Sequence, residues 1–314
     1  MSVTNALNPN VVKTYLDGLF YPEWDGNELP EIATADDAFV FNQETSDQSQ
    51  ETIEEFTGSG AWEARGELQD APEGQPQSLY SYSFVNNELA KGVTISGRFF
   101  DDDRHAMVSK IMRDFASKGV ASKNRDAFSV FRNAFTAGSA YGDAVALCSA
   151  SHPILGGTQS NIGTAKLSED SLNTAIVALA EMKERDGVIL GRLPHCLLVP
   201  IANYKRASII LDSELRSGTA QNDMNVYSSK YGIYLKATPY LGTASGGSDD
   251  YWFILAKNHP VMRYLRQDIK TTLVDRSVTK NDSYFYRGSF RQSVGAASYV
   301  GIWGSNGTTG SYDA

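Results

Sequence analysis

Residues 143–161 read DAVALCSASHPILGGTQSN and form the most distinctive stretch of the chain. Two runs with apolar residues at helical spacing come directly before it. The first run contains Met107, Val108, Ile111, Met112 and Phe115, and the second contains Ala127, Phe128, Phe131, Ala134 and Phe135. Together they predict one long, nearly continuous amphipathic helix with a break at Gly119.

Three consecutive aspartates, Asp101 to Asp103, precede this predicted helix. Acidic side chains are favoured at a helix N-terminus, because the helix dipole and the free N–H groups attract them. Carboxylates also bind hard cations, so a metal site is the alternative. We interpret the three aspartates as residues that cap the helix.

The segment 42–90 is acidic and rich in turn residues. It holds ten carboxylates and one basic residue, Arg65, together with four glycines and two prolines after position 57. Its apolar residues, such as Phe56, Trp62 and Leu68, are too sparse for a core. Turns between short strand-like stretches predict an extended acidic hairpin. A flexible acidic surface loop is the alternative that composition leaves open. Strand character returns at 79–100.

A first helix is predicted after residue 10. Its apolar residues recur on one face, at Val11, Val12, Tyr15, Leu16 and Leu19. In an isolated N-terminal arm, we expect a neighbouring subunit to cover this face. Downstream, the patterns predict helices at 168–186 and 201–211, strands at 193–199, 232–240 and 251–256, and a strand-rich end at 269–303 with a charged turn at 275–282.

Composition excludes several classes of protein. The net charge is -9, and no block of Lys and Arg exists that could grip duplex DNA, so any contact with DNA is expected to be non-specific. Cys148 and Cys196 form neither a CxxC motif nor a disulfide framework. We find no signal peptide and no apolar stretch of about 20 residues that could span a membrane.

Few residue combinations point to catalysis. The four histidines lack metal-ligand spacing, and the phosphate-binding and hydrolase motifs are absent. Cys148 and His152 could act as nucleophile and base only with a special turn and an orienting third group. His195 and Cys196 point to opposite faces of a predicted strand. We predict no catalytic residue, no cofactor and no metal, and an enzyme of unrecognised type is the least favoured alternative.

The stretch 143–161 resembles the Mu-like major head subunit family of tailed phages, in which a "DG…F…HP…GTQSN"-like sequence follows a two-part helix. The passage 95–112 and the sequence LLVP at 197–200 are also similar to that family. Ala144 departs from the pattern, since glycine is expected there. The resemblance covers the chain from about Gly92 onward.

The resemblance implies a mixed α+β chain with the tailed-phage major capsid protein fold, of the Hong-Kong-ninety-seven type. The implied parts are an N-terminal arm at 1–45, an extended acidic hairpin loop at 46–92, a peripheral domain with a spine helix at 93–154, an axial domain at 155–262, the peripheral return strands and threefold turn at 263–293, and a final axial strand and C-terminal tail at 294–314. The implied function is a structural subunit that self-assembles into the icosahedral capsid of a tailed bacteriophage around double-stranded DNA. The alternative is the shell subunit of an encapsulin-like nanocompartment.

The resemblance also implies contacts between subunits. The acidic hairpin should dock on a basic strip of a neighbour, for which the candidates are Arg104, Lys110, Arg113, Lys118 and Lys123. The full set of contact candidates is Phe56, Trp62, Glu54, Glu55, Arg65, Arg104, Lys110, Arg113, Arg276, Lys280 and Asp282. Some family members link subunits through a Lys–Asn bond from the hairpin, but no Lys occurs in 42–90, so we expect a non-covalent shell.

The expected partners are further copies of the chain, in hexamers and pentamers, and a portal, with a decoration protein as an optional partner. No scaffolding-like segment is read at the N-terminus, so we expect a separate scaffold protein; the alternative is a scaffolding segment that was cleaved off before this sequence begins. The expected location is the virion capsid, assembled in the cytoplasm of the host bacterium.

Overall fold

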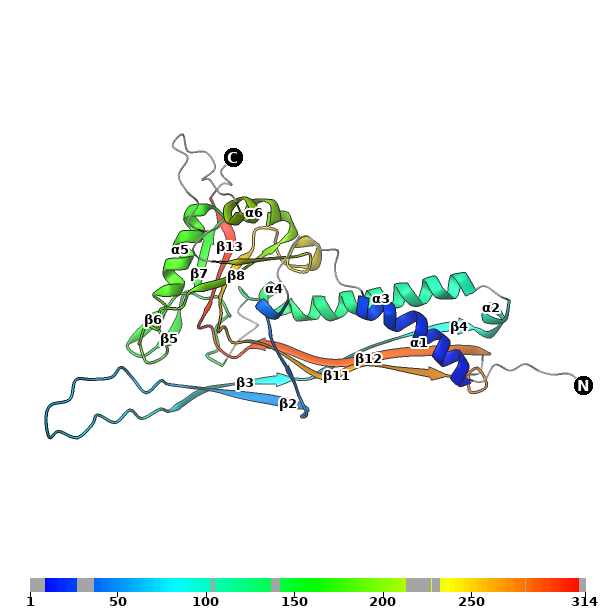
Figure 1. Cartoon of the computed structure of the whole chain (residues 1–314), viewed down its shortest axis with the longest axis horizontal. Helices are drawn as coiled ribbons and strands as arrows, with labels where there is room; N and C mark the ends of the chain where they lie inside the picture. Colours follow the sequence, from blue (N-terminus) through cyan, green and yellow to red (C-terminus); the bar gives the residue numbers. More distant parts are fainter. Residues whose placement is uncertain are drawn as a thin grey trace, which may run out of the picture.

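The computed structural model describes residues 9–26, 37–102, 105–136, 142–212, 227, 232–279 and 281–310. Its helices and strands mix as the predicted α+β class requires. Figure 1 shows two units side by side and a long hairpin that projects past one of them. We call them the four-stranded unit, the five-stranded unit and the hairpin.

The four-stranded unit is a sheet covered by helices. Its strands lie in the order β1 (Asn42–Thr45), β11 (Val261–Val274), β12 (Ser283–Ala296) and β4 (Asn87–Ser96). β1 is parallel to β11, and the other neighbours are antiparallel. Helix α1 (Pro9–Gly26) packs on α3 (His105–Ala127), the spine helix, and both lie over the sheet (Figure 1). Burial of their apolar side chains against the strands stabilises the unit.

Helix α1 forms where its spacing predicts, but the face it buries differs. The structure buries Val12, Leu16, Phe20 and Trp24, each four residues after the last, and leaves Val11 exposed. The expectation that a neighbouring subunit covers α1 is wrong, because α3 and the sheet of the same chain already do so.

The predicted helix break at Gly119 is also wrong, because α3 continues through it. Glycine is needed there for a close approach of two helices. A Cβ at this position would lie 2.6 Å from the ring of Trp24. The helix does end before 138, since α3 stops at Ala127 and only the short α4 (Ser129–Arg132) follows.

The aspartates before α3 do not all cap it, which corrects the capping interpretation. Asp101 ends a separate short helix, α2 (Gly97–Asp101), and accepts a hydrogen bond from Arg276 at 2.8 Å. Asp103 lies outside the described residues. The turn between β11 and β12, which carries Arg276, is therefore tied to the segment that enters the spine helix.

The five-stranded unit contains the larger apolar core. Its strands lie in the order β7 (Ile162–Ala165), β13 (Ile302–Thr309), β10 (Trp252–Ala256), β8 (Pro194–Pro200) and β9 (Tyr234–Thr238). The strands predicted at 193–199, 232–240 and 251–256 are confirmed. Helices α5 (Glu169–Ala180) and α6 (Tyr204–Asp212) pack on the sheet. A small ladder of β5 (His152–Ile154) and β6 (Gly157–Gln159) lies beside it.

The hairpin consists of β2 (Gln50–Phe56) and β3 (Ser78–Val85), which pair antiparallel. All residues from 59 to 79 are exposed, so the loop between the strands has no core of its own. The strand character at 79–100 divides between two sheets, because β3 belongs to the hairpin whereas β4 pairs with β12.

Strands β11 and β12 connect the units. Each has 14 residues, and β11 begins soon after β10 while β12 ends shortly before β13. Their pairing shifts register between Leu265 and Gln267 and again between Gln267 and Lys270. The two cores are therefore joined by one hydrogen-bonded ribbon with irregular pairing near its middle.

Candidate functional site

The motif at 143–161 folds into a buried cluster of polar side chains. Nδ1 of His152 lies 2.7 Å from Oδ2 of Asp143, and its Nε2 lies 3.1 Å from Oδ1 of Asn161. His152 and Asn161 are fully buried, and the Asp143 side chain is 1% exposed. Buried polar groups cost free energy unless they are hydrogen-bonded. Each of the three supplies a partner for another.

Asn161 joins separate segments of the chain. Its Nδ2 donates to the carbonyls of Leu147 and Ile302 at 2.8 and 3.2 Å, and its Oδ1 accepts from the backbone N–H of Ser149 at 2.8 Å. These bonds define the direction of the amide, so it is the oxygen that faces His152. Because Ile302 begins β13, Asn161 ties the motif to the five-stranded sheet.

Both ring nitrogens of His152 therefore face oxygen acceptors. Nδ1 is within hydrogen-bond distance of the Asp143 carboxylate, and Nε2 is within hydrogen-bond distance of the Asn161 amide oxygen. The ring also stacks on Tyr299, with centroids 3.9 Å apart and planes 8° from parallel. These contacts hold the imidazole in a single orientation.

The turn that starts the motif places Ala144 in the left-handed region, with φ of 63°. This conformation is unfavourable for a residue with a Cβ and easy for glycine. The N–H of Val145 donates to Oδ1 of Asp143 at 3.3 Å, which leaves Oδ2 for the cluster. The one departure from the family pattern thus occupies a position that glycine suits better.

Arg185 connects the cluster to the hairpin. Its NH2 donates to Oδ2 of Asp143 at 3.1 Å and to Oε2 of Glu55 at 2.9 Å, and its NH1 donates to the carbonyl of Pro153 at 2.6 Å. The Arg185 side chain is only 4% exposed. Since Glu55 belongs to β2, the base of the hairpin is anchored to the five-stranded unit.

Aromatic rings and a backbone contact strengthen this anchor. The Arg185 guanidinium lies over the rings of Tyr80 and Tyr299, 4.9 and 4.6 Å from their centroids. Such cation–π contacts are strongest where water is excluded. Just beyond β2, the N–H of Gly60 donates to Oδ2 of Asp186 at 3.2 Å. The hairpin is held from both of its strands up to Gly60, and the part beyond is exposed.

The charges of the cluster stabilise one another. Burial alone would raise the pKa of Asp143, but the hydrogen bonds and charges of His152 and Arg185 outweigh burial and lower it. Burial likewise opposes the charge of Arg185, but hydrogen bonds to Glu55 and Asp143 raise its pKa. The arrangement is an ion network that fixes chain segments.

The cluster is not arranged for nucleophilic catalysis. Burial raises the pKa of the Cys148 thiol, and both nitrogens of His152 are already bonded to other residues. The Cys148–His152 pair considered from the sequence is therefore not a catalytic pair. Burial also raises the pKa of Cys196, to about 12.

Within the described ranges, no three His, Cys, Asp or Glu side chains are grouped to hold a metal ion. In the same part of the chain, no helix has the length and apolar character needed to cross a membrane.

The contact candidates on the hairpin differ in their surroundings. Trp62 is 100% exposed, and Phe56 and Arg65 are also exposed. Glu54 accepts a hydrogen bond from Ser78 across the hairpin at 3.3 Å and stays exposed. Glu55 is the exception, because its carboxylate already pairs with Arg185 of its own chain.

Of the predicted basic strip, Lys110 and Arg113 are exposed on α3 and form no ion pair with the described residues. Lys118 pairs with Asp114 at 2.7 Å, and Lys123 lies 3.9 Å from Asp268. Arg104 lies outside the described residues.

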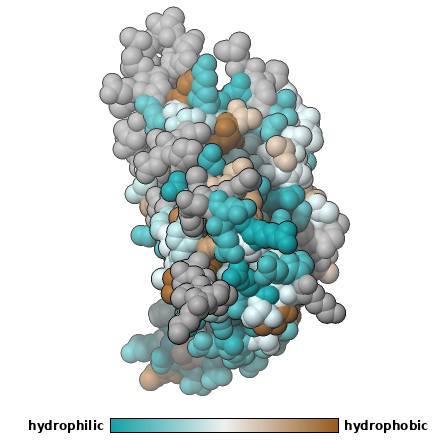
Figure 2. Space-filling view, turned by 90° about the vertical axis from the view of Figure 1, so that its right-hand side faces the viewer, coloured by the Kyte–Doolittle hydropathy of each residue, from teal (hydrophilic) through white to brown (hydrophobic). Residues whose placement is uncertain are grey.

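At the turn 275–282, Arg276 pairs with Asp101, and the carbonyl of Asp282 accepts from Gly97 N–H at 2.9 Å. Lys280 lies outside the described residues. Seen from the end that carries α2, the surface is largely hydrophilic, with scattered hydrophobic residues (Figure 2).

Residues 87–304, well over half of the sequence, match the family described as phage capsid protein. The chain belongs to this family. It is a structural subunit of a phage capsid and not an enzyme, and its place is the virion capsid. The match supports a phage shell over a nanocompartment.

Solved structures show the fold of this capsid protein. A chain of Microbacterium phage Oxtober96 superposes with a TM-score of 0.54 at 12% identity, covering 89% of the capsid protein and 93% of that chain. The capsid of Myoviridae phage XM1 superposes with a TM-score of 0.52 at 15% identity, and the match covers 88% of the capsid protein and 94% of that chain. A virus-like particle from Pyrococcus furiosus superposes with a TM-score of 0.53 at 13% identity, and the match covers 93% of the capsid protein and 99% of that chain. The Hong-Kong-ninety-seven type fold is confirmed. No curated protein matches the sequence.

Sequence reasoning missed the pair between Glu55 and Arg185 of the capsid protein. The two residues are separated by 130 positions, and no spacing rule relates them. Arg185 stands near the end of a segment predicted as helix, where a basic residue is unremarkable. The available signal was Glu55 itself, since the alternation in β2 places it on the less exposed face of that strand.

Proposed function

We propose that this capsid protein belongs to the Mu-like branch of its family and assembles as hexamers and pentamers in the host bacterial cytoplasm, with a separate scaffold protein and a portal. The motif at 143–161 supports the branch, because its Asp, His and Asn side chains interlock in one cluster. In this proposal the four-stranded unit is the peripheral domain and the five-stranded unit is the axial domain.

The proposed parts keep the boundaries expected from the sequence. They are the N-terminal arm at 1–45, the hairpin loop at 46–92, the peripheral domain with the spine helix at 93–154, the axial domain at 155–262, the peripheral return strands at 263–293, and the final axial strand and tail at 294–314. Strand β4 crosses the boundary at 92. The turn 275–282 forms the threefold contact. The turn carries Asp275, Arg276 and Asp282, and these charges suit an interface built from charged pairs.

The hairpin of each subunit reaches over a neighbour and docks on the neighbour's spine helix. The observation that carries this contact is an imbalance of charge on two exposed surfaces. The loop 59–79 presents four carboxylates and only one cation, Arg65, to solvent. On α3, Lys110 and Arg113 are exposed and pair with no described residue. Opposite charges on two copies of one chain orient the contact between them.

Weak contacts of this kind are sufficient for a closed shell. Each subunit repeats the same contact around the shell, and closure makes the later contacts effectively intramolecular. The segment 42–90 contains no lysine, so the hairpin has no amine for a covalent link. The shell is non-covalent, and boiled, denatured shells should run on a gel as one band near 34.3 kDa. A ladder of linked chains would contradict this.

The decisive experiment reverses charge on the spine helix. Lys110→Glu with Arg113→Glu should leave the subunit folded, because both side chains are exposed, but should prevent or strongly reduce closed particles in negative-stain microscopy. The matched partner is Glu63→Lys with Glu67→Lys on the hairpin loop. Each double variant alone should assemble poorly, and combining all four changes in one chain should restore shells. Normal shells from the first variant would refute the proposed contact.

A further inference from the structure

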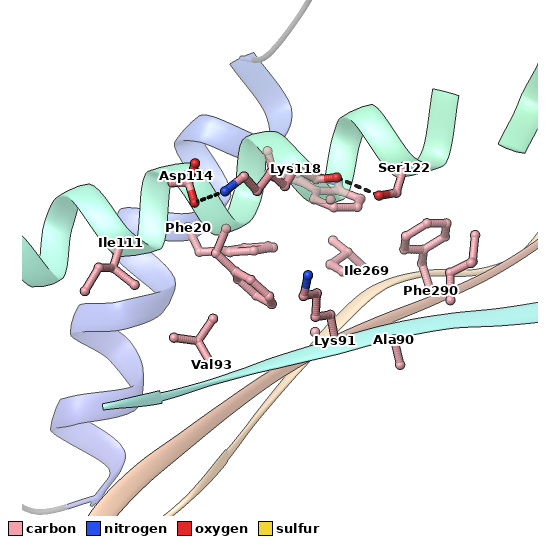
Figure 3. Close-up of a pocket in the computed structure, with 15 residues that line it drawn as sticks. Phe20, Ala90, Lys91, Val93, Ile111, Asp114, Lys118, Ser122, Ile269 and Phe290 are labelled. Atoms are coloured by element: carbon pink, nitrogen blue, oxygen red, sulfur yellow. Dashed lines mark hydrogen bonds and ion pairs between the residues drawn. The ribbon is translucent and has the colours of Figure 1, made fainter. Parts of the chain in front are cut away.

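A pocket of about 270 Å³ lies between the spine helix and the edge of the four-stranded sheet. Figure 3 shows α3 above it, β4 below it, and α1 behind it. Its lining is mainly apolar, with Phe20 and Trp24 from α1, Val93 from β4, Ile111 from α3 and Phe290 from β12. An open apolar pocket on a shell-forming protein is a surface that an apolar side chain can fill.

The hairpin loop carries the side chain that fits. Trp62 is 100% exposed, whereas Trp24, Trp252 and Trp303 are all buried. Leu68, further along the same loop, is 97% exposed and is held at a φ of 67°, a region unfavourable for a residue with a Cβ. Exposed aromatic side chains are typical anchors of an interface, and Trp is enriched among them.

The pocket cannot take Trp62 of its own chain. The anchor formed by Glu55 with Arg185, and by Gly60 with Asp186, holds the hairpin base against the five-stranded unit. Beyond that anchor the loop projects away from the spine helix, and the two lie at separate places along the molecule (Figure 1). The occupant must come from a second copy.

Charge favours the same pairing. Lys91 reaches from β4 into the space below α3, and Lys118 pairs with Asp114 at its upper edge (Figure 3). The pocket lining thus carries two cations and one anion, and Lys110 and Arg113 lie on the same helix. The loop that bears Trp62 has Glu63 as its next residue and is acidic overall. A carboxylate beside the inserted ring would meet the ammonium of Lys91, which forms no ion pair with any residue that the structure describes.

We propose that Trp62 of one subunit inserts into the pocket beneath the spine helix of a neighbouring subunit, with Glu63 placed near Lys91. This inference rests on the proposed hairpin contact and names the side chain that anchors it. The charged strip then orients the hairpin, and the buried indole supplies most of the affinity.

The first test is fluorescence quenching by iodide, in free subunits and in purified shells. Because the other three tryptophans are buried, the quenched fraction reports Trp62. We expect strong quenching in subunits, protection in shells, and little quenching in either state for Trp62→Phe. Shells in which Trp62 remains as quenched as in free subunits would overturn the inference and leave the charge-based docking intact.

The second test traps the contact. Both native cysteines are buried, so an introduced pair reacts without interference. Shells of Ala61→Cys with Ala90→Cys, which keep Trp62 and place one cysteine beside it and the other on the pocket lining, should give a ladder of linked chains after mild oxidation. The matched control pairs Ala61→Cys with Val177→Cys, an exposed position on α5 of the five-stranded unit, and should stay monomeric on the gel. A ladder in the control but not in the pocket pair would overturn the inference.

The third test changes assembly itself. Trp62→Ala should raise the subunit concentration needed for shells by at least about tenfold, as truncation of an aromatic anchor does. Ile111→Trp, which fills the pocket from its own chain, should have the same effect. Normal assembly of both variants overturns the Trp62 anchor alone. If unmodified subunits form no shells under any condition, the proposed hairpin contact fails with it.

Discussion

Replacement of Arg185 by Met should release the hairpin from the body of the subunit. The guanidinium is 4% exposed and faces two carboxylates, those of Asp143, 1% exposed, and Glu55, 14% exposed. Met has a side chain of similar length but supplies no charge, so the cation–π contacts with Tyr80 and Tyr299 are lost as well. Breaking a buried ion pair by removing one partner costs about 3–5 kcal/mol, because the remaining charge stays buried without compensation. We expect the free energy of unfolding to fall by that amount.

The loss should be largest where the hairpin joins the body. Urea unfolding of the unassembled subunit gives the total change, and hydrogen exchange shows where protection is lost. We expect faster exchange across β2 and β3 before any change in β10 or β8. Arg185→Lys keeps the charge but not the forked geometry, so its free energy of unfolding should lie between those of the unmodified subunit and Arg185→Met.

Arg287→Met is the matched control, since Arg287 pairs with Glu88 at 2.8 Å with both side chains about half exposed. Exposed pairs contribute about 0–1 kcal/mol. If Arg185→Met were no less stable than Arg287→Met, and β2 and β3 exchanged as slowly as in the unmodified subunit, the anchor would not have the role described here.

Three further predictions concern single positions. Ala144→Gly should raise the free energy of unfolding by about 1 kcal/mol, because glycine adopts a left-handed φ without strain. Urea unfolding measures this change. An unchanged unfolding midpoint would show that Ala144 is not strained. Gly119→Ala should lower the free energy of unfolding by about 1–3 kcal/mol despite the better helix propensity of alanine, because the added Cβ meets the ring of Trp24. The fluorescence of Trp24 should change as well. A gain in stability would mean that the two helices separate at no cost. Burial lowers the pKa of His259 from 6.5 to about 4, and its neutral ring bonds two backbone groups. A lowered folded-state pKa gives stability that is complete above pH 6.5 and is lost as the pH falls toward 4, by about 3 kcal/mol. His259→Gln should flatten this slope in unfolding measured from pH 7 to pH 4.5.

Local patterns predicted the elements that depend on local contacts. Apolar runs such as the one in β10 were assigned correctly, because a strand buried on both faces leaves a continuous signal in the sequence. The prediction of a helix break at Gly119 was wrong, because a glycine can either end a helix or allow another helix to pack closely against it, and the sequence does not distinguish the two. Only the position of Trp24, nearly a hundred residues earlier, distinguishes them.

The site was found in part. Asp143, His152 and Asn161 stood out through a resemblance, but their role as a buried network depends on Arg185 and on Glu55 in a distant strand. Single-sequence reasoning cannot pair such residues, because ion pairs carry no periodicity. It also treated Glu55 as a surface contact, for the reason that the surrounding segment is acidic.

Strands β11 and β12 together form a beam about 45 Å long whose two ends lie in different cores. Between Leu265 and Lys270 the pairing of this beam is interrupted twice, and such bulges bend a strand and add local twist. Resistance to flexing is therefore lowest there, while the packed cores at either end stay rigid. In the proposed shell of hexamers and pentamers, subunits at fivefold and sixfold positions need slightly different tilts. One short run of backbone near the centre of the beam is where a single sequence can accommodate both.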